Sequence, residues 1–261
     1  MNRERALPRT VVVLAVVGSL AVALPVLGML ADVPWSRLPA VLSSDTALDA
    51  LRLSLVSSLS ATALATVLGV PLALLLARGD FPGRSVVRGL VLLPLVLPPV
   101  VAGTALLAVL GRRGLLGGPL ERATGLVLPF STAGVVIATT FVAMPFLVIT
   151  VEGALRQLDP RHEDAAATLG AGPWTILRRI TLPTIRPALV AGLALTWARA
   201  LGEFGATITF AGSLQGRTRT LPLAVFVALE GDRDLAIALS LVLVAVSLAV
   251  IVGLRDRWWT S

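Results

Sequence analysis

The sequence predicts an all-α integral membrane protein: a single domain, residues 1–261, of six membrane-spanning helices with one long cytoplasmic loop. Of its 261 residues 56% are apolar and 14% charged, whereas about a quarter of the residues in a soluble domain are charged. The apolar residues also gather in runs near 20 residues, the length at which a helix crosses the hydrocarbon core. Six such helices use about 120 residues, which leaves no room for a second globular domain.

Six apolar runs are expected to form the spanning helices. They are residues 10–30, 54–77, 89–110, 132–151, 187–210 and 235–254. The first run resembles a signal peptide, because Arg3, Arg5 and Arg9 precede it and the run contains residues 21–23, Ala-Val-Ala. Since its apolar stretch continues beyond the usual h-region, a retained helix is the favoured interpretation. Small residues recur along the second run, which predicts close helix packing.

The third run is predicted to bend. It contains Pro94, Pro98 and Pro99, and proline removes a backbone donor from a helix. Such bends are tolerated at membrane depth where neighbouring helices or a cavity satisfy the freed backbone groups. Two interpretations stay open: the bend serves packing, or Pro98 and Pro99 line a translocation path.

The fifth run carries two charges and two glycines. Arg199 and Glu203 are four residues apart and share a helix face. An unpaired charge at this depth is costly, so the two are expected to pair. With Gly202 and Gly205 beside them, the pair either braces a kink or borders the path.

The arginines predict the orientation. Thirteen fall on the side of the two termini and eight on the opposite side, which predicts cytoplasmic termini. The same distribution explains the net charge of +7 better than nucleic-acid binding does. Trp35, Trp258 and Trp259 lie at the ends of runs and are expected to anchor the chain at the membrane interface.

Several activities are excluded by composition. All 22 basic residues are arginine, and a Walker A loop or a Schiff-base enzyme requires lysine. If nucleotide drives this protein, another chain must bind it, and no cofactor is expected in this one. Cysteine is absent and His162 is the single histidine, so we predict neither a catalytic residue nor a metal site.

The longest cytoplasmic loop, residues 152–186, is predicted to contain two short helices. Asp159 suits the N-cap of the first, Pro160 its first position and Gly170 its end. After the break at residues 172–173 a second helix is expected over 174–181. Helices this short are marginal alone, so the membrane domain and a partner should hold them.

This loop resembles the EAA loop of the permease subunits of bacterial ABC importers. Asp164-Ala165-Ala166, Gly170 and Ile180-Thr181-Leu182-Pro183 match its spacing. The family has Glu where Asp164 stands, and Glu163 precedes it here. In the family this loop is a coupling helix that docks into the ATPase. The resemblance assigns that role to Glu163, Asp164, Ala165, Ala166, Gly170, Ile180, Leu182 and Pro183.

The resemblance narrows to the molybdate branch of these permeases, with the sulfate branch as a near relative. It runs through residues 97–103, 112–114, 198–207 and 210–223. It implies the ABC importer permease fold and a path or gate formed by Pro98, Pro99, Arg199, Glu203, Phe204 and Gly205.

The resemblance also implies the function and the partners. The expected solute is molybdate, with tungstate, imported across a bacterial inner membrane. The expected partners are a second copy of the chain, two ATPases that bind ATP and Mg, an extracytoplasmic oxyanion-binding protein and membrane lipids, without nucleic acid. The alternatives are a sulfate or thiosulfate permease and an ion-coupled secondary transporter, which Glu203 beside Arg199 fits poorly. An intramembrane enzyme would need a nucleophile and base that the sequence does not offer.

Overall fold

The computed structural model describes residues 8–258, without the side chains of 250, 251 and 253–258, and over this range its regular secondary structure is all helical. The longer helices are α1 (Arg9–Ala31), α3 (Asp45–Arg78), α4 (Arg84–Val96), α5 (Pro99–Leu110), α7 (Thr132–Gln157), α11 (Arg186–Leu201) and α14 (Arg233–Trp258). The shorter ones are α2 (Leu38–Leu42), α6 (Gly117–Thr124), α8 (Arg161–Thr168), α9 (Pro173–Ile176), η1 (Leu177–Thr181), α10 (Leu182–Thr184), α12 (Gly205–Ala211) and α13 (Leu221–Ala228). The all-helical prediction is confirmed.

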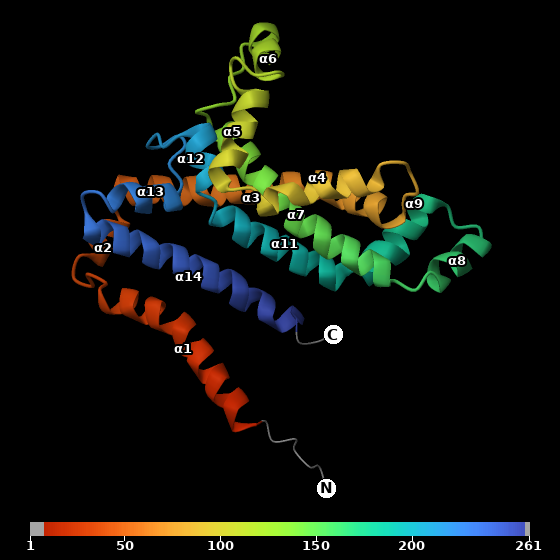
Figure 1. Ribbon diagram of the computed structural model, residues 1–261, viewed down its shortest axis with the longest axis horizontal. Helices are drawn as coiled ribbons and strands as arrows, with labels where there is room; N and C mark the ends of the chain where they lie inside the picture. Colours follow the sequence, from red (N-terminus) through yellow and green to blue (C-terminus); the bar gives the residue numbers. More distant parts are fainter. Residues whose placement is uncertain (1–7, 259–261) are drawn as a thin grey trace.

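Helices α3, α7 and α11 form the centre of the molecule and run side by side (Figure 1). Close approach depends on small residues, because a Cβ on Gly69 of α3 would lie 3.2 Å from Met144 Cγ of α7. On α11, a Cβ on Gly192 would lie 3.0 Å from Leu147 Cδ1. Ser57, Ala61 and most of the other small residues of α3 are buried, which confirms the predicted packing role of the second run.

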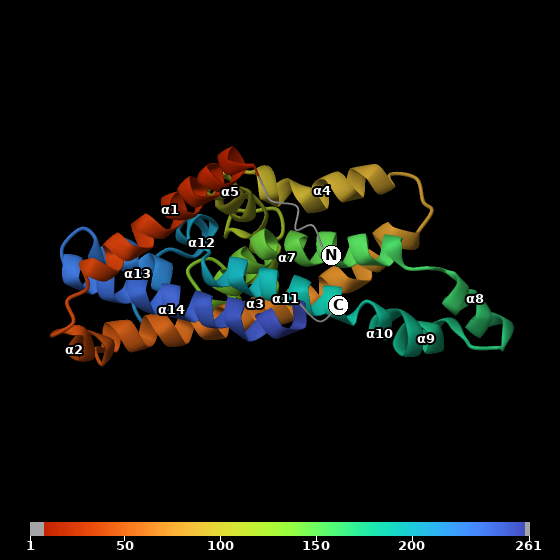
Figure 2. The ribbon, with the colours of Figure 1, turned by 90° about the horizontal axis from the view of Figure 1, so that it is seen from below.

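The two ends of the molecule are built differently. Helices α8, α9 and α10 project from one end of the α3–α7–α11 bundle, and α2 and α13 lie at the other (Figures 1 and 2). At the α2 end, Gln215 Nε2 donates to Thr46 Oγ1 at 3.2 Å and the Leu221 N–H donates to Ser54 Oγ at 2.6 Å. These bonds tie the segment between α12 and α13 to the start of α3.

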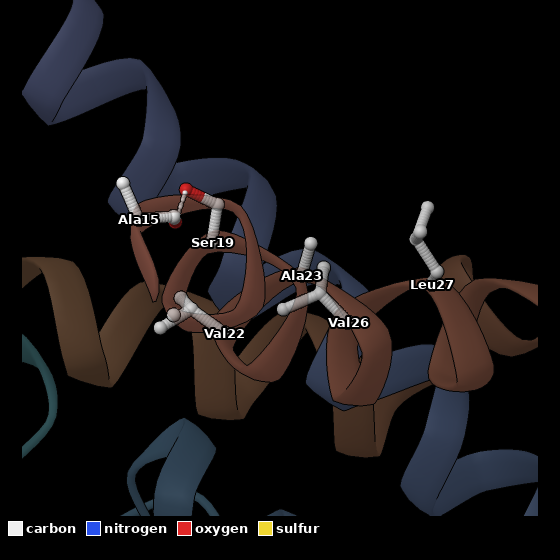
Figure 3. A pocket seen from close by; sticks show the side chains of 7 residues that line it. Ala15, Ser19, Val22, Ala23, Val26 and Leu27 are labelled. Atoms are coloured by element: carbon white, nitrogen blue, oxygen red, sulfur yellow. Dashed lines mark hydrogen bonds between the residues drawn. The ribbon is translucent and has the colours of Figure 1, made fainter. Parts of the chain in front are cut away.

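Helix α1 packs mainly along α14, and none of its residues is buried. A pocket of about 720 Å³ along it is lined, among the described residues, by α1 alone (Figure 3). Two ion pairs hold the α1–α2 connection to the start of α14: Arg37, the N-cap of α2, to Asp234 at 3.0 Å, and Arg233 to Asp32, the C-cap of α1, at 2.6 Å. Arg3, Arg5 and Trp259 lie outside the described residues, while Trp35 between α1 and α2 is exposed.

Two of the predicted spans, the third and the fifth, are not continuous helices in the structure. The third run divides at Leu97 and Pro98 into α4 and α5, because Pro98 has no N–H to continue the first helix and Pro99 begins the next. The fifth divides after Leu201 into α11 and α12. The bends themselves were predicted. The second run is longer than predicted, since α3 begins at Asp45.

The count of six spans stays a prediction. Over the described residues, α1, α3 and α7 are long and apolar enough to cross a membrane. The segment Pro173–Thr184 and α11 pass the same test together as a pair bent by 72°. Helix α5 is apolar but short, so the structure supports a multi-pass membrane protein with interrupted helices.

Candidate functional site

The loop between α7 and α11 is fastened to the membrane helices through Glu163. The Arg78 guanidinium, in the last turn of α3, lies 2.7 Å from Glu163 Oε1. The hydroxyl of Thr181, which is fully buried, donates to the same oxygen. One carboxylate thus joins α8, η1 and α3, and these residues border a pocket of about 260 Å³.

Glu163 stays ionised in this position. Burial raises the pKa of its carboxyl, but the hydrogen bonds from Arg78 and Thr181 and the Arg78 charge outweigh this, so the pKa lies below its usual value of 4.5. The carboxylate is therefore a charged acceptor at neutral pH. Its side chain is 16% exposed, so surrounding water screens the pair only in part.

The rest of the predicted coupling sequence divides into an anchored part and an exposed part. Ile180 and Leu182 are half-buried, and Leu182 packs against the cluster of α3 and α7 side chains that includes Leu147 and Leu155. Asp164 and Ala165 are exposed, and Ala166 is half-buried. Pro183 is exposed in the first turn of α10.

Gly170 ends α8 as predicted, with φ +85°, a conformation that favours glycine. The start of α8 lies one residue later than predicted, with Pro160 at the N-cap and Arg161 as the first helical residue, although Asp159 Oδ1 still accepts from the Arg161 N–H at 3.0 Å. The second predicted helix is different: α9 covers only Pro173–Ile176 and then widens into the π-helical η1. This change of pitch accompanies the burial of Thr181 toward Glu163.

Sequence reasoning missed two exposed apolar side chains at the tip of the loop. Leu169 is 88% and Trp174 65% exposed, and the Arg178 guanidinium lies 5.2 Å from the Trp174 ring centre. The sequence did contain a signal for both side chains, because Leu169 and Trp174 are large apolar residues that stand beside the polar end of a short helix. Together with Asp164, Ala165 and Arg178 they give this part of the loop a surface of mixed apolar and charged side chains.

The second group of predicted residues lies where α5 meets α12, and the structure brings the two broken spans together. A Cβ on Gly205, the first residue of α12, would overlap the Pro99 ring at the start of α5. A Cβ on Gly103 would similarly overlap Thr209. Pro98 is the N-cap of α5, so both helices begin at this contact.

The predicted ion pair of the fifth span is confirmed. Arg199 Nη2 lies 2.6 Å from Glu203 Oε2, and the Glu203 side chain is 2% exposed. Glu203 Oε1 also accepts from the Ala206 N–H at 2.8 Å, which satisfies a free donor in the first turn of α12. The carboxylate therefore binds the end of α11 to the start of α12, which supports the bracing interpretation. Phe204, between them, packs on Phe226 with ring centres 5.1 Å apart.

The two groups lie apart. The α5–α12 contact is near the middle of the bundle and the α8–α9 tip is at its end (Figure 1). Among the described residues, no cluster of three or more His, Asp or Glu side chains could hold a metal ion. The two groups are thus an exposed loop tip at one place and a close contact between two broken helices at the other.

Interrupted apolar helices and a docked polar loop at one end are features of a membrane permease. The chain belongs to the family of binding-protein-dependent transport system inner membrane components, because the sequence model of this family matches residues 69–260. Permeases of this kind are not themselves enzymes.

The most informative relative is a molybdenum transport system permease protein, ModB, of Mycobacterium tuberculosis. It is 50% identical over 259 residues, covering 98% of this chain and 97% of the relative. A sulfate transport system permease protein, CysW, of Synechococcus elongatus is 41% identical but covers 68% of this chain and 62% of its own length.

The fold is shared with solved transporters. A bacterial alginate ABC transporter, crystallised with its alginate-pentasaccharide-bound periplasmic protein, matches with a TM-score of 0.77 at 18% identity. The match covers 95% of this chain and 92% of that one. The predicted ABC importer permease fold is confirmed.

Proposed function

We propose that this chain is the membrane-spanning permease of an importer that carries molybdate, and also tungstate, into the cytoplasm. The observation that carries the proposal is the 50% identity to a molybdenum permease over nearly the whole of both chains. The sulfate relative matches a shorter part of each chain, so a sulfate or thiosulfate importer is the second candidate. Membership of the importer family leaves the ion-coupled transporter without support.

Transport would be driven by other subunits. The exposed tip formed by Asp164, Ala165, Leu169 and Trp174 suits docking into a cleft of a cytoplasmic ATPase, one for each of two permease copies. ATP and Mg would be bound by that ATPase. The Glu163 anchor would then transmit the ATPase's movement to α3 and η1, since a loose loop would transmit none.

The remaining partners follow from the same architecture. The opposite end, near α2 and the 212–220 segment, would receive an oxyanion-binding protein, where most solute discrimination should occur. The unburied surface of α1 is available to lipid and to a second copy of the chain. The arginine distribution supports cytoplasmic termini and a cytoplasmic α8–α10 loop.

A path between kinked helices would admit a small tetrahedral anion without trapping it. At the α5–α12 contact, Arg199 is already neutralised by Glu203, so no bare cation is available there to hold an anion tightly. Pro98, Pro99, Phe204 and Gly205 would form the surface that opens when α5 and α12 separate. Their role is therefore steric gating.

Uptake in a permease-deletion strain tests the solute. The chain would be expressed with its ATPase and binding protein, and molybdoenzyme activity at trace molybdate measured beside sulfate uptake at low sulfate. We expect rescue of the first only, and loss of rescue when the ATPase carries a hydrolysis-blocking substitution. Rescue of sulfate uptake alone would overturn the molybdate assignment and keep the importer.

A further inference from the structure

A basic pocket lies at the α8 end of the molecule, distinct from the pocket at the Glu163 anchor. It has a volume of about 430 Å³ and is lined by Phe81, Gly83, Arg84, Ser85, Arg88 and Arg156. These residues come from the α3–α4 connection, the first turns of α4 and the last turn of α7. We call it the arginine pocket.

The three arginines of this pocket are held in place but not neutralised. Arg88 and Arg156 both bind Glu152 Oε1, the Arg156 contact at 3.0 Å. Arg84 donates from Nε to the Leu76 carbonyl at 2.9 Å and from Nη2 to the Ala77 carbonyl at 3.2 Å. Glu152 thus binds two of the three guanidinium groups and Arg84 binds only backbone carbonyls, so these four side chains carry an excess of two positive charges.

Each guanidinium also keeps unused donors. The hydrogen bonds of Arg84, Arg88 and Arg156 leave from Nε and Nη2, and within the described residues no acceptor binds their Nη1 atoms. The first turn of α4 opens at the same pocket and has no side-chain cap, so its field favours the same sign of ligand. Converging guanidinium donors at this spacing suit the oxygens of a phosphate group.

The position of the pocket along α4 indicates where such a phosphate comes from. On the opposite face of α4, Val86 and Leu90 are 63% and 62% exposed, as expected for side chains that contact the hydrocarbon of a bilayer. Arg84 and Arg88 stand at the beginning of this apolar stretch. The pocket therefore lies at the depth of the lipid headgroups, where phosphate is concentrated.

We propose that the arginine pocket binds the phosphate of an anionic phospholipid, which fixes the connection between α3 and α4 beside the coupling loop. The site follows from the geometry of this chain and its place in a membrane. The assignment to the cytoplasmic leaflet alone rests on the proposed orientation. Binding requires neither solute nor ATP, so its test is independent of transport.

Ser85 offers a matched pair of variants, because it is exposed and its side chain makes no hydrogen bond within the described structure. Ser85→Asp places a negative charge in the pocket without touching any arginine contact, and an acid is well tolerated in the first turn of a helix. Ser85→Asn is similar in size and neutral. Both variants leave the Glu152 and Leu76 contacts intact, so both should fold.

The experiment is native mass spectrometry of the full-length chain purified with its ATPase, titrated with phosphatidylglycerol or phosphatidylcholine. We expect preferential retention of phosphatidylglycerol, unchanged in Ser85→Asn and weakened about five- to tenfold in Ser85→Asp. Equal retention of the two lipids, or equal retention by the two variants, would overturn the proposal. Displacement of phosphatidylglycerol by millimolar inorganic phosphate or molybdate would assign the pocket to a free oxyanion and overturn the lipid assignment.

Discussion

The Arg78 guanidinium and the Glu163 carboxylate, 85 residues apart in the sequence, form a 2.7 Å ion pair that joins the last turn of α3 to the first turn of α8. Thr181 reaches the same carboxylate from η1. Glu163 is therefore the charged anchor of the α8 part of the loop, while Leu182 holds the later part by apolar packing, so loss of the Glu163 charge should loosen α8 without unfolding the bundle.

Glu163→Gln should loosen the loop. A hydrogen bond to a charged group contributes about 1.5–3 kcal/mol, and the partial exposure of Arg78 reduces this to about 1–2 kcal/mol. We expect faster trypsin cleavage after Arg161 and weaker coupling of transport to ATP hydrolysis in the reconstituted complex. Asp164→Asn, next to it but exposed, is the control for cleavage. Equal cleavage of both variants would contradict the anchor.

The same anchor should depend on pH in one direction. Because the pKa of Glu163 is lowered by folding, its stabilisation is complete above the unfolded value near 4.5 and is lost as pH falls through the folded value. A spin label at Thr168→Cys, in this cysteine-free chain, should keep constant mobility from pH 8 to 5 and become mobile only below that. With Glu163→Gln added, this acid transition should disappear. Its persistence would assign the transition to another group.

Gly205→Ala should destabilise the meeting point of α5 and α12. The added Cβ overlaps the Pro99 ring, and overpacking of this kind costs about 1–3 kcal/mol. Gly202→Ala is the matched control, since the nearest atom to its Cβ is the Ala198 carbonyl oxygen at 3.8 Å. In detergent, the melting temperature of Gly205→Ala should be lower than that of Gly202→Ala. Equal melting temperatures would show that α5 and α12 part freely at this point.

Arg199 and Glu203 should be energetically coupled. Arg199→Met strands a buried carboxylate and Glu203→Gln strands the guanidinium, whereas the double variant strands neither. Gln still offers an oxygen to the Ala206 N–H, so the cap is preserved. The double variant should be more stable than the sum of the single effects predicts, by about 1 kcal/mol or more. If the two single effects on stability simply add up in the double variant, Arg199 and Glu203 do not stabilise each other.

The proposed orientation can be tested by labelling single cysteines. Thr168→Cys on α8 and Gln215→Cys before α13 are both exposed positions at opposite ends of the molecule. An impermeant maleimide added to spheroplasts, which exposes the outer face of the inner membrane, should label position 215 and not 168, and inside-out vesicles should reverse this. The opposite pattern would place the loop outside.

Periodicity and composition predicted the helices, but not where two of them stop. Pro98 and Gly202 were recognised as sites of bending, yet the apolar residues continue past both, so hydropathy alone joins α4 to α5 and α11 to α12. The break is decided by tertiary contact: Pro99 against Gly205, and Glu203 against the Ala206 N–H. Pro99 and Gly205 are about 100 positions apart, so local sequence does not encode their contact, whereas the Glu203–Ala206 bond is local and completes the break.

In the loop between α7 and α11, too, local sequence could not predict the position of one particular residue. Glu163 and Asp164 both suit the first turn of a helix, and the family spacing selects Asp164. Only the position of Arg78 at the end of α3 and of Thr181 on η1 determines that Glu163 faces the bundle while Asp164 stays exposed. The sequence thus located the loop correctly but could not divide its residues between anchoring and docking.

Helix α3 spans both ends of the molecule as one continuous element of 34 residues. At 1.5 Å per residue it is about 51 Å long, well beyond the roughly 30 Å of a hydrocarbon core. Thr46 in its first turn contacts Gln215, and Arg78 in its last turn contacts Glu163. Its one weak point is Pro71, which cannot donate the backbone bond of a regular helix. A tilt of α3 would therefore move its contact with Gln215 and its contact with Glu163 together, so we expect a single helix, and not a relay of side chains, to link the two ends of the molecule mechanically.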